Sequence, residues 1–550
     1  MVQYSDAYCV IKRSSMAAPS KSGLDKNNKY DRQLRLWGDH GQTALESARV
    51  CLINVTATGT EILKNLILPG VGSYTIVDGN KVSGEDVGNN FFLSKDSLGR
   101  SLAQVATEFL AELNDDVTGD FVEESAENLL QSNPDFFTTF SIVIATNLSE
   151  RTLLQLDELL WEKGVPLLVC RCYGFIGEMR LVVKEHTVIE SHPDSAHDDL
   201  RLDNPFSGLV QYCDSLDLAN MTKKEHSHTP WLVVLYKFLQ QWKEEHNGQA
   251  PKNYKEKTQL KAMIRQGTMK KEDDIPEEEE NFEEAVQHLN SALVPTSIPS
   301  EVKKIFEDPA CCHLNSESKS FWILAKAVKD FVQMKGSLPL RGTIPDMTAD
   351  SKRYIQLQNV YREHAERDME EVMQHVQRLL QEIGKGPNTI TEKDVRLFCK
   401  NASFMRVVRC RSLAEEYNSS KANIAELGMC LEDEEGDDLI FYILLRGVDK
   451  FYEEFNRYPG WYNDQVESDI IKLKAFIVKL LHDWGLPPTV KDDFVHEICR
   501  YGAAELHSVA AMMGGVAAQE VIKIITGQFV PINNSFIYNA MKQTSKTVQL

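Results

Sequence analysis

The patterns of a doubly wound α/β sheet occur at both ends of this chain and are missing from its middle. Near the N-terminus, 49–55 (RVCLINV) predicts a β-strand, 60–68 (TEILKNLIL) a helix and 73–79 (SYTIVDG) a second strand. This strand–turn–helix–strand order is typical of the start of a parallel sheet. Further predicted elements are helices at 100–114 and 152–162 and strands at 141–146, 165–170 and 175–183, the last of them a candidate antiparallel strand.

The same signature returns at the C-terminus. Residues 507–527 predict a helix in which Gly514 and Gly515 allow close approach of another backbone, and Gly527 is placed to end it. The segment 529–540 (FVPINNSFIYNA) predicts a terminal strand. We therefore expect an α/β domain of the doubly wound, Rossmann-like class that is built from both ends of the chain.

The middle of the chain is predicted to be a large, mostly α-helical insertion. Its long helical patterns lie at 231–242, 321–334, 354–383 and 469–484, and no internal repeat is present. The predicted organisation is a disordered extension at 1–28, the first part of the α/β domain at 29–184, the helical insertion at 185–486 and the last part of the α/β domain at 487–550.

Composition excludes several classes of protein. A net charge of −21 argues against a nucleic-acid-binding protein, which needs a basic face. No apolar run approaches the length of a membrane span, and no signal peptide is evident, so we expect a cytoplasmic protein, with the nucleus as an alternative. The eleven cysteines form no Cys-x-x-Cys pair, so no metal site is predicted. Acidic runs at 272–284 and 432–438 fit solvated loops, or docking sites for a basic partner.

The turn after the first predicted strand lies where such a fold binds a nucleotide, but it has lost most of its glycines. Phosphates need glycine there because they approach the backbone closely. Asn54 and Thr56 stand at two of the glycine positions, and Gly59, which lets helix and strand pack, remains. Asp78 ends the second strand, where an acid binds a ribose hydroxyl. We expect no productive ATP binding here; an unusual or purely structural pocket is the alternative.

Three further segments carry a family resemblance. The segments 30–42 (YDRQLRLWGDHGQ), 342–368 (beginning GTIPDMTADSKRYIQLQN) and 509–533 (VAAMMGGVAAQEVIKIITGQFVPIN) resemble the ubiquitin-like-protein activating enzymes. The resemblance covers nearly the whole chain from Lys29. In that family two related adenylation folds pair, as a heterodimer or a tandem fusion, and one of the two keeps the glycine loop and a catalytic cysteine.

Departures from the family pattern indicate which subunit this is. Active subunits carry Asn-Arg-Gln where this chain has Gly88-Asn89-Asn90; no cysteine precedes a threonine, and the paired zinc ligands are missing. The resemblance thus implies a non-catalytic, regulatory subunit that stabilises a catalytic subunit, is inactive alone and binds no cofactor, with ATP and Mg²⁺ held by the partner. The long insertion favours the modifier used in neddylation over SUMO.

The resemblance also suggests functional residues. It implies that Arg32 reaches the partner's ATP site in trans and stabilises charge on the leaving phosphates. The alternative for Arg32 is a surface salt bridge with Asp31 or Asp39. Residues predicted to contact the catalytic subunit are His226, His228, Asp346, Met347, Asp350, Tyr354 and Gln356. Helix capping and surface packing are the alternatives for the histidines, and an ordinary loop entering a helix for the remainder.

Two rival functions come from other classes. A self-sufficient dehydrogenase or ATP-dependent enzyme requires the glycine cradle that residues 54–59 lack. A helical scaffold with no enzymatic association would not need an α/β domain built from both ends of the chain, or the arginine-containing segment at 30–42. The sequence therefore favours the regulatory subunit.

Overall fold

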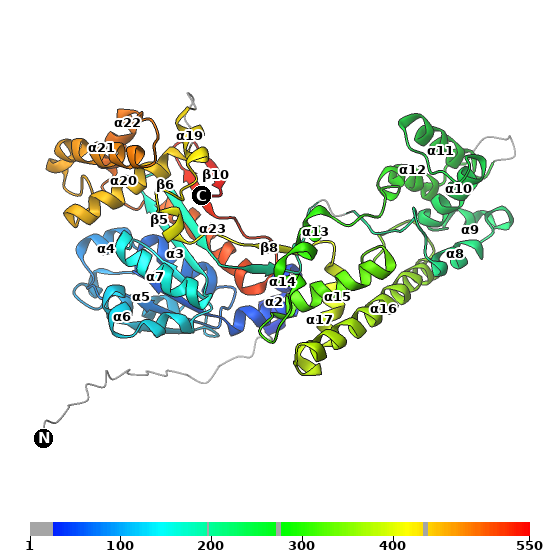
Figure 1. The fold of residues 1–550 in the computed structure, drawn as a ribbon, viewed down its shortest axis with the longest axis horizontal. Coiled ribbons are helices and arrows are strands. Elements are labelled where there is room, and N and C mark those ends of the chain that lie inside the picture. Colours follow the sequence, from blue (N-terminus) through cyan, green and yellow to red (C-terminus); the bar gives the residue numbers. More distant parts are fainter. Residues whose placement is uncertain (1–25, 195–196, 271–276, 433–437) are drawn as a thin grey trace, which may run out of the picture.

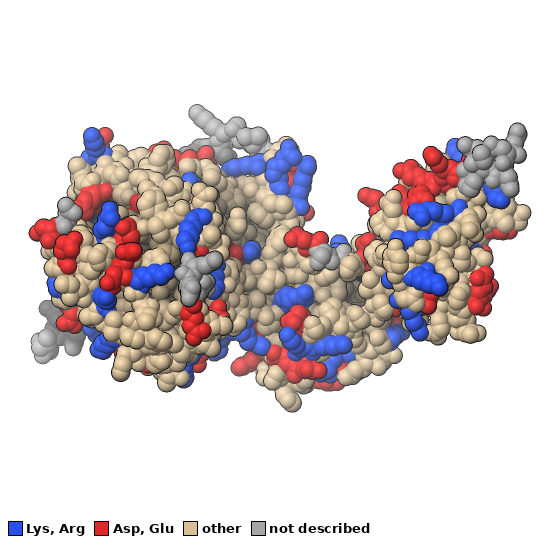
Figure 2. Space-filling model, turned by 90° about the horizontal axis from the view of Figure 1, so that it is seen from above, with Lys and Arg blue, Asp and Glu red and all other residues tan. Residues whose placement is uncertain are grey.

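The computed structural model describes residues 26–194, 197–270, 277–432 and 438–550. Figure 1 shows an α/β body from which a long helical arm extends to one side, and Figure 2 shows the surface hollowed between the body and the far end of the arm. Both termini of the described chain belong to the body. The prediction for 1–28 lies largely outside the described residues, although Lys26–Lys29 form a short helix, α1.

One eight-stranded sheet forms the centre of the body, in the order β10-β9-β6-β5-β4-β1-β2-β3. Neighbouring strands from β5 to β3 run parallel, whereas β6, β9 and β10 are joined by antiparallel pairing. The strands are β1 (Arg49–Ile53), β2 (Ser73–Val77), β3 (Thr118–Val122), β4 (Ile142–Ala145), β5 (Leu167–Tyr173), β6 (Ile176–Val182), β9 (Ser535–Asn539) and β10 (Thr544–Val548). The predicted sheet from both chain ends is confirmed, since β9 pairs with β6.

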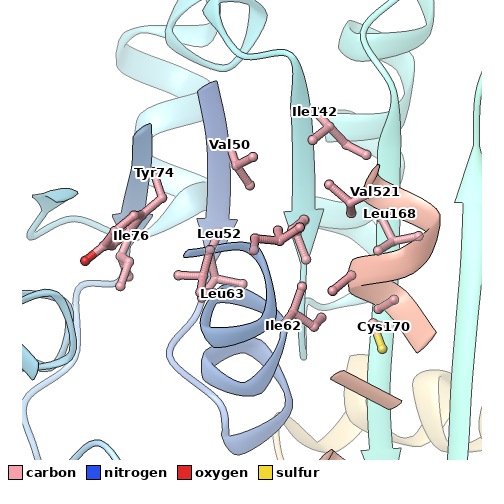
Figure 3. Packing of buried hydrophobic residues seen from close by; sticks show 14 of the residues in the cluster. Val50, Leu52, Ile62, Leu63, Tyr74, Ile76, Ile142, Leu168, Cys170 and Val521 are labelled. Carbon is pink, nitrogen blue, oxygen red and sulfur yellow. The ribbon is translucent and has the colours of Figure 1, made fainter. Parts of the chain in front are cut away.

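Helices cover both faces of the sheet because side chains alternate along each strand. Val50 and Leu52 of β1 face Ile62 and Leu63 on one side (Figure 3), whereas Cys51 belongs to the core on the other side. The first face is covered by α3 (Ala57–Ile67), α5 (Leu102–Ala111) and α23 (His507–Thr526), and the second by α6 (Ala126–Ser132) and α7 (Glu150–Lys163). The entry helix α2 (Asp31–Ser47) packs on α23.

Helix α23 lies against α3, as the two glycines predicted, but they differ in role. A Cβ atom added at Gly514 would lie 2.6 Å from Glu61 Cβ, whereas one added at Gly515 would meet nothing within 4 Å. Close approach of the two helices therefore depends on Gly514. Among the described helices, α23 is also the one long and apolar enough to cross a membrane, but its residues are part of the sheet's core.

The predicted insertion divides between two places. Residues 413–501 return to the body, where the first short helix packs on α7 and the later helices cover Tyr173, Ile176 and Ile537. These helices are α18 (Leu413–Glu416), α19 (Ile424–Glu432), α20 (Ile440–Phe455), α21 (Val466–Asp483) and α22 (Asp492–Tyr501). The predicted boundary at 486 falls between α21 and α22, which pack on each other.

The arm is formed by the residues between β7 (His186–Val188) and β8 (Arg406–Val408), two strands that pair at its root. The 32-residue helix α16 (Ser351–Glu382) runs through both of its cores. The far core contains α8 (Ser207–Asp214), α10 (Trp231–Glu245), α11 (Tyr254–Gln266) and α12 (Glu280–Ala292), with α9 (Lys223–Ser227) beside it. The near core contains α13 (Ser300–Glu307), α14 (Pro309–Cys312), α15 (Ser320–Lys335) and α17 (Glu392–Asn401).

Candidate functional site

The glycine-poor turn connects β1 to α3 at the point where the strand order reverses, which is where doubly wound sheets bind ligands. Asn54 has a φ of 67°, a left-handed conformation that favours glycine. Its side-chain amide donates to Thr146 O at 2.8 Å and to Asn147 O at 3.3 Å. The Asn54 side chain thus ties the turn to the end of β4 (Ile142–Ala145) and holds a shape that glycine would otherwise supply.

Thr56 and Gly59 define the start of α3. Thr56 is the N-cap, and its hydroxyl oxygen accepts the Gly59 N–H at 2.9 Å. A Cβ atom at Gly59 would lie 3.0 Å from Leu52 Cδ1 and 3.2 Å from Asn54 O. The helix and strand therefore approach closely at Gly59, and Thr56 caps the helix in front of it.

Asp78 directly follows β2, and its carboxylate contacts the turn. One carboxylate oxygen accepts the Val55 N–H at 2.8 Å, and the other accepts the backbone and side-chain N–H groups of Asn80 at 2.8 and 2.9 Å. Burial raises the pKa of Asp78, against the opposing effect of these hydrogen bonds. Asp78 stands where this class of fold places a ribose-binding acid, and both of its oxygens are used within the chain.

A second carboxylate, from Glu505, lies at the N-terminus of α3. It accepts the Ala57 N–H at 2.7 Å, the Thr58 hydroxyl at 2.6 Å and, more weakly, the Thr58 N–H at 3.4 Å. Glu505 is 7% exposed, and burial raises its pKa, which the hydrogen bonds oppose. The N-terminal amides of a helix are the groups that would hold a phosphate, so here an internal anion takes that position.

Glu505 was not predicted from the sequence, because nothing local marks a glutamate near the C-terminal helix as a partner of a turn at residue 57. Asn90 also contacts the turn. By the family resemblance, it stands where active subunits have the glutamine of the Asn-Arg-Gln motif. Its side chain accepts from Phe92 N and Thr60 Oγ1 and donates to Thr56 O. The chain's own side chains thus satisfy the amides of Val55, Ala57, Thr58 and Gly59.

Arg32 lies in the first turn of α2 and points into solvent. Its side chain is 89% exposed, and its Nε lies 4.0 Å from Asp31. Asp31 is held more closely by Arg35, whose Nη2 is 3.0 Å away. A surface salt bridge therefore does not explain the presence of Arg32 well, and its guanidinium remains available to another molecule.

The two segments predicted to contact a partner lie side by side. The backbone N–H of Asp350 donates to His228 O at 3.0 Å, and Arg353 donates to Glu225 O at 2.6 Å. Asp350 is the N-cap of α16, and its carboxylate accepts the Arg353 N–H. The exposed or half-buried members of this surface are His228, Asp346, Met347, Asp350, Tyr354 and Gln356.

His226 lies beneath that surface and not on it. The residue is 4% exposed, its Nδ1 lies 2.7 Å from Glu279 Oε1, and its ring stacks on Phe282. Because Glu279 and Phe282 cover the imidazole, His226 supports the fold of the helix end and is removed from the set of candidate contact residues. Nearby, Thr229 donates its hydroxyl to Glu225 O, and Pro230 is the N-cap of α10.

The cysteines of the described ranges are buried apart from Cys312. Burial raises the pKa of Cys311, Cys399 and Cys499 to about 12, which disfavours the nucleophilic thiolate. Within these same ranges, no group of three or more His, Cys, Asp or Glu residues is placed to hold a metal ion.

Comparison with known proteins gives a consistent assignment. The model of the ThiF family matches residues 30–550. The chain is 59% identical to the NEDD8-activating enzyme E1 regulatory subunit of Danio rerio over 527 residues, which cover 96% of this chain and 99% of that protein. It is 47% identical to the protein of that name from Drosophila melanogaster (98% and 100% covered) and 26% identical to that from Saccharomyces cerevisiae (95% and 100% covered).

Proposed function

Because this chain belongs to the ThiF family and to the NEDD8-activating enzyme E1 regulatory subunits within it, we propose that it pairs with a catalytic subunit to activate NEDD8. In this proposal the catalytic subunit holds ATP and Mg²⁺, adenylates the C-terminus of the modifier and receives it on a cysteine. The chain described here is inactive alone and stabilises its partner. An equivalent role for SUMO is not favoured, since the relatives reported above carry the NEDD8 name.

The observation that carries the non-catalytic role is the filled nucleotide turn. Glu505 and Asp78 place two carboxylates on the amides of Ala57 and Val55. A phosphate at this position would have to displace Glu505 and would meet the negative charge of both groups. Glycines introduced at Asn54 and Thr56 would leave these carboxylates in place, so we expect that the glycines alone would not create a nucleotide site.

Arg32 is the residue of this chain that we propose takes part in the adenylation step. Attack of the modifier's carboxylate on the α-phosphate expels pyrophosphate, whose charge must be stabilised. The exposed guanidinium of Arg32 can hold two phosphate oxygens at once, which a lysine cannot do. Delivery of this group to the partner's ATP site would make activity depend on assembly, as an arginine finger does.

We propose that one surface of the arm contacts the catalytic subunit. It is formed by His228, Asp346, Met347, Asp350, Tyr354 and Gln356. Its acids and its half-buried aromatic and aliphatic side chains fit a contact patch with a polar rim. The segments 226–231 and 346–359 support the proposal together because hydrogen bonds join them, from Asp350 N–H to His228 O and from Arg353 to the Thr229 hydroxyl.

Gel filtration followed by an adenylation assay tests this function. We expect the purified chain to co-elute with the catalytic subunit, and NEDD8-dependent ATP–pyrophosphate exchange to require both proteins. Calorimetry of the chain alone should detect no micromolar ATP binding. Exchange by the isolated chain would support the self-sufficient enzyme, whereas a failure to co-elute would support the helical scaffold.

A further inference from the structure

Two connected cavities lie at the near end of the arm, away from the nucleotide turn. The first, of about 350 Å³, lies among the segments 197–201, 294–299, 336–341 and 399–406. The second, of about 420 Å³, continues between the loop at 340–342, α16 and α17. Arg341, Cys399 and Lys400 line both, so the two form one groove, which we call the Arg341 groove. Its volume is in the range of ligand-binding sites.

Basic side chains line this groove from several elements. Two are paired within the chain: Arg201 with Asp199 at 2.6 Å, and Arg396 with Glu366 and Glu392. The cations that make no ion pair within 4 Å among the described residues are Arg341, Arg362, Lys400 and Arg406. In a chain with a net charge of −21, this local excess of unpaired cations is unexpected.

Arg341 is the central member. Its Nε is buried and has no hydrogen-bond partner, while its guanidinium lies 4.9 Å from the centre of the Phe404 ring. A buried N–H without an acceptor costs about 1–3 kcal/mol, so such a group usually has a partner that completes it. A carboxylate is a suitable acceptor because it can bind a guanidinium through two parallel hydrogen bonds.

The remaining lining indicates which kind of anion fits. Leu338, Pro339 and Val294 offer apolar contacts between the cations, which suits the side chains of a peptide. The acids Asp198, Asp199, Glu363 and Glu366 interrupt the basic surface, and so oppose the continuous phosphate backbone of a nucleic acid. A single phosphate ion would engage a small part of a groove whose cations spread over both cavities.

We propose that the Arg341 groove binds an acidic peptide segment of a partner protein. Carboxylates of the segment would pair with Arg341 and Lys400 in the shared part of the groove, with Arg406 and Arg362 at its two ends. This inference is independent of the proposed function, because no groove residue belongs to the nucleotide turn, to Arg32 or to the surface around Asp350.

Fluorescence anisotropy with labelled peptides tests the proposal on the full chain. The probe is the peptide (Glu-Gly-Leu)₄, and its control is the (Gln-Gly-Leu)₄ counterpart. At physiological salt we expect the acidic peptide to bind with a Kd of about 10–100 µM, and the neutral one at least about tenfold more weakly. The double variant Arg341→Gln/Lys400→Gln should lose about tenfold in affinity for the acidic peptide.

A matched control variant distinguishes binding of the peptide in the groove from general attraction to a positively charged surface. Lys252→Gln/Lys255→Gln removes the same charge from an exposed part of the arm outside the groove and should leave binding unchanged. Should Arg341→Gln fail to fold, Arg362→Gln/Lys400→Gln carries the same test at exposed positions. The proposal is overturned by equal binding of the neutral peptide, by an equal loss in both double variants, by displacement with equimolar inorganic phosphate, or by tighter binding of an oligouridylate.

Discussion

Glu505 accepts the backbone N–H of Ala57 at 2.7 Å, although 448 residues separate the two in the chain. The bond joins the segment before the C-terminal helix to the first turn of α3. The last part of the chain thus supplies the group that fills the first part's nucleotide turn. One carboxylate therefore stabilises the turn and also occupies the position that a phosphate would take.

Replacing Glu505 by alanine should destabilise the body. The change leaves the amides of Ala57 and Thr58 and the Thr58 hydroxyl buried without acceptors, at a cost of about 2–4 kcal/mol. Glu505→Gln keeps one acceptor oxygen and should lose less. Thermal unfolding of the purified chain measures both, and equal midpoints for wild type and Glu505→Ala would show that the contact does not hold the turn.

The two glycines of α23 should respond in opposite directions to alanine. Gly514→Ala places a Cβ atom 2.6 Å from Glu61 Cβ and should destabilise the chain by about 1–3 kcal/mol, because α3 and α23 must separate. Gly515→Ala meets open space and should stabilise by up to about 1 kcal/mol through helix propensity. Thermal unfolding of the matched pair gives the comparison; similar shifts would contradict the packing described.

Arg32→Ala should slow adenylation without preventing assembly. Loss of one charge-stabilising donor lowers rates by about 10²–10³-fold, and Arg32→Lys should recover part of that loss. Arg35→Ala is the control, because Arg35 is nearby, exposed and paired with Asp31. The readout is ATP–pyrophosphate exchange by the heterodimer. A rate for Arg32→Ala within about twofold of wild type would return this residue to a surface role, since such a change is far below that expected for a lost donor.

The arm surface can be tested without disturbing its helix. Asp350 caps α16, so reversal of its charge would confuse loss of contact with loss of the cap. The double change Asp346→Lys/Tyr354→Ala alters the surface and spares the cap, and should weaken binding to the catalytic subunit by about tenfold or more. Asp350→Ser, which keeps a capping hydroxyl, is the control for the fold. Wild-type affinity of the double variant in a direct binding assay would exclude the surface.

His186 should make the root of the arm sensitive to acid. Burial, reinforced by Lys319, lowers its pKa to about 4, and its Nε2 has no partner. The unfolded chain therefore takes up a proton first, near the ordinary pKa of about 6.5, and the folded state loses stability as pH falls from there towards 4. Between pH 7 and pH 5 the loss is about 2 kcal/mol. His186→Phe should remove it, so its advantage in thermal midpoint should grow on acidification; a constant difference would contradict this assignment.

The sequence predicted the buried strands of the sheet and the longest helices, but it missed the buried helix α20 and two strands at the edges of the sheet. Both β3 and β10 are mostly exposed or half-buried and carry polar residues such as Asp120 and Lys546. An edge strand is paired on one side only and needs no apolar pattern, so the continuous run of apolar residues that identified β1 and β4 is missing there.

The candidate site was predictable where the signal was local. Missing glycines at Asn54 and Thr56 marked the turn as unusual, and their positions in the structure agree with that interpretation. Glu505 and the burial of His226 depend on partners distant in the chain, at Ala57 and Glu279. A single sequence carries no signal for such pairs, because burial and pairing are set by the packed fold.

The pairing of β6 with β9 also has a consequence for synthesis of the protein. Arg180 on β6 pairs with Ser535 on β9. The β6 edge of the sheet that the first six strands form therefore stays unpaired until almost the entire remainder of the chain has left the ribosome. An uncovered strand edge invites pairing with other chains. The nascent chain is thus most exposed to aggregation while the arm is being made, and a message truncated before residue 535 would yield a protein whose sheet can never be completed.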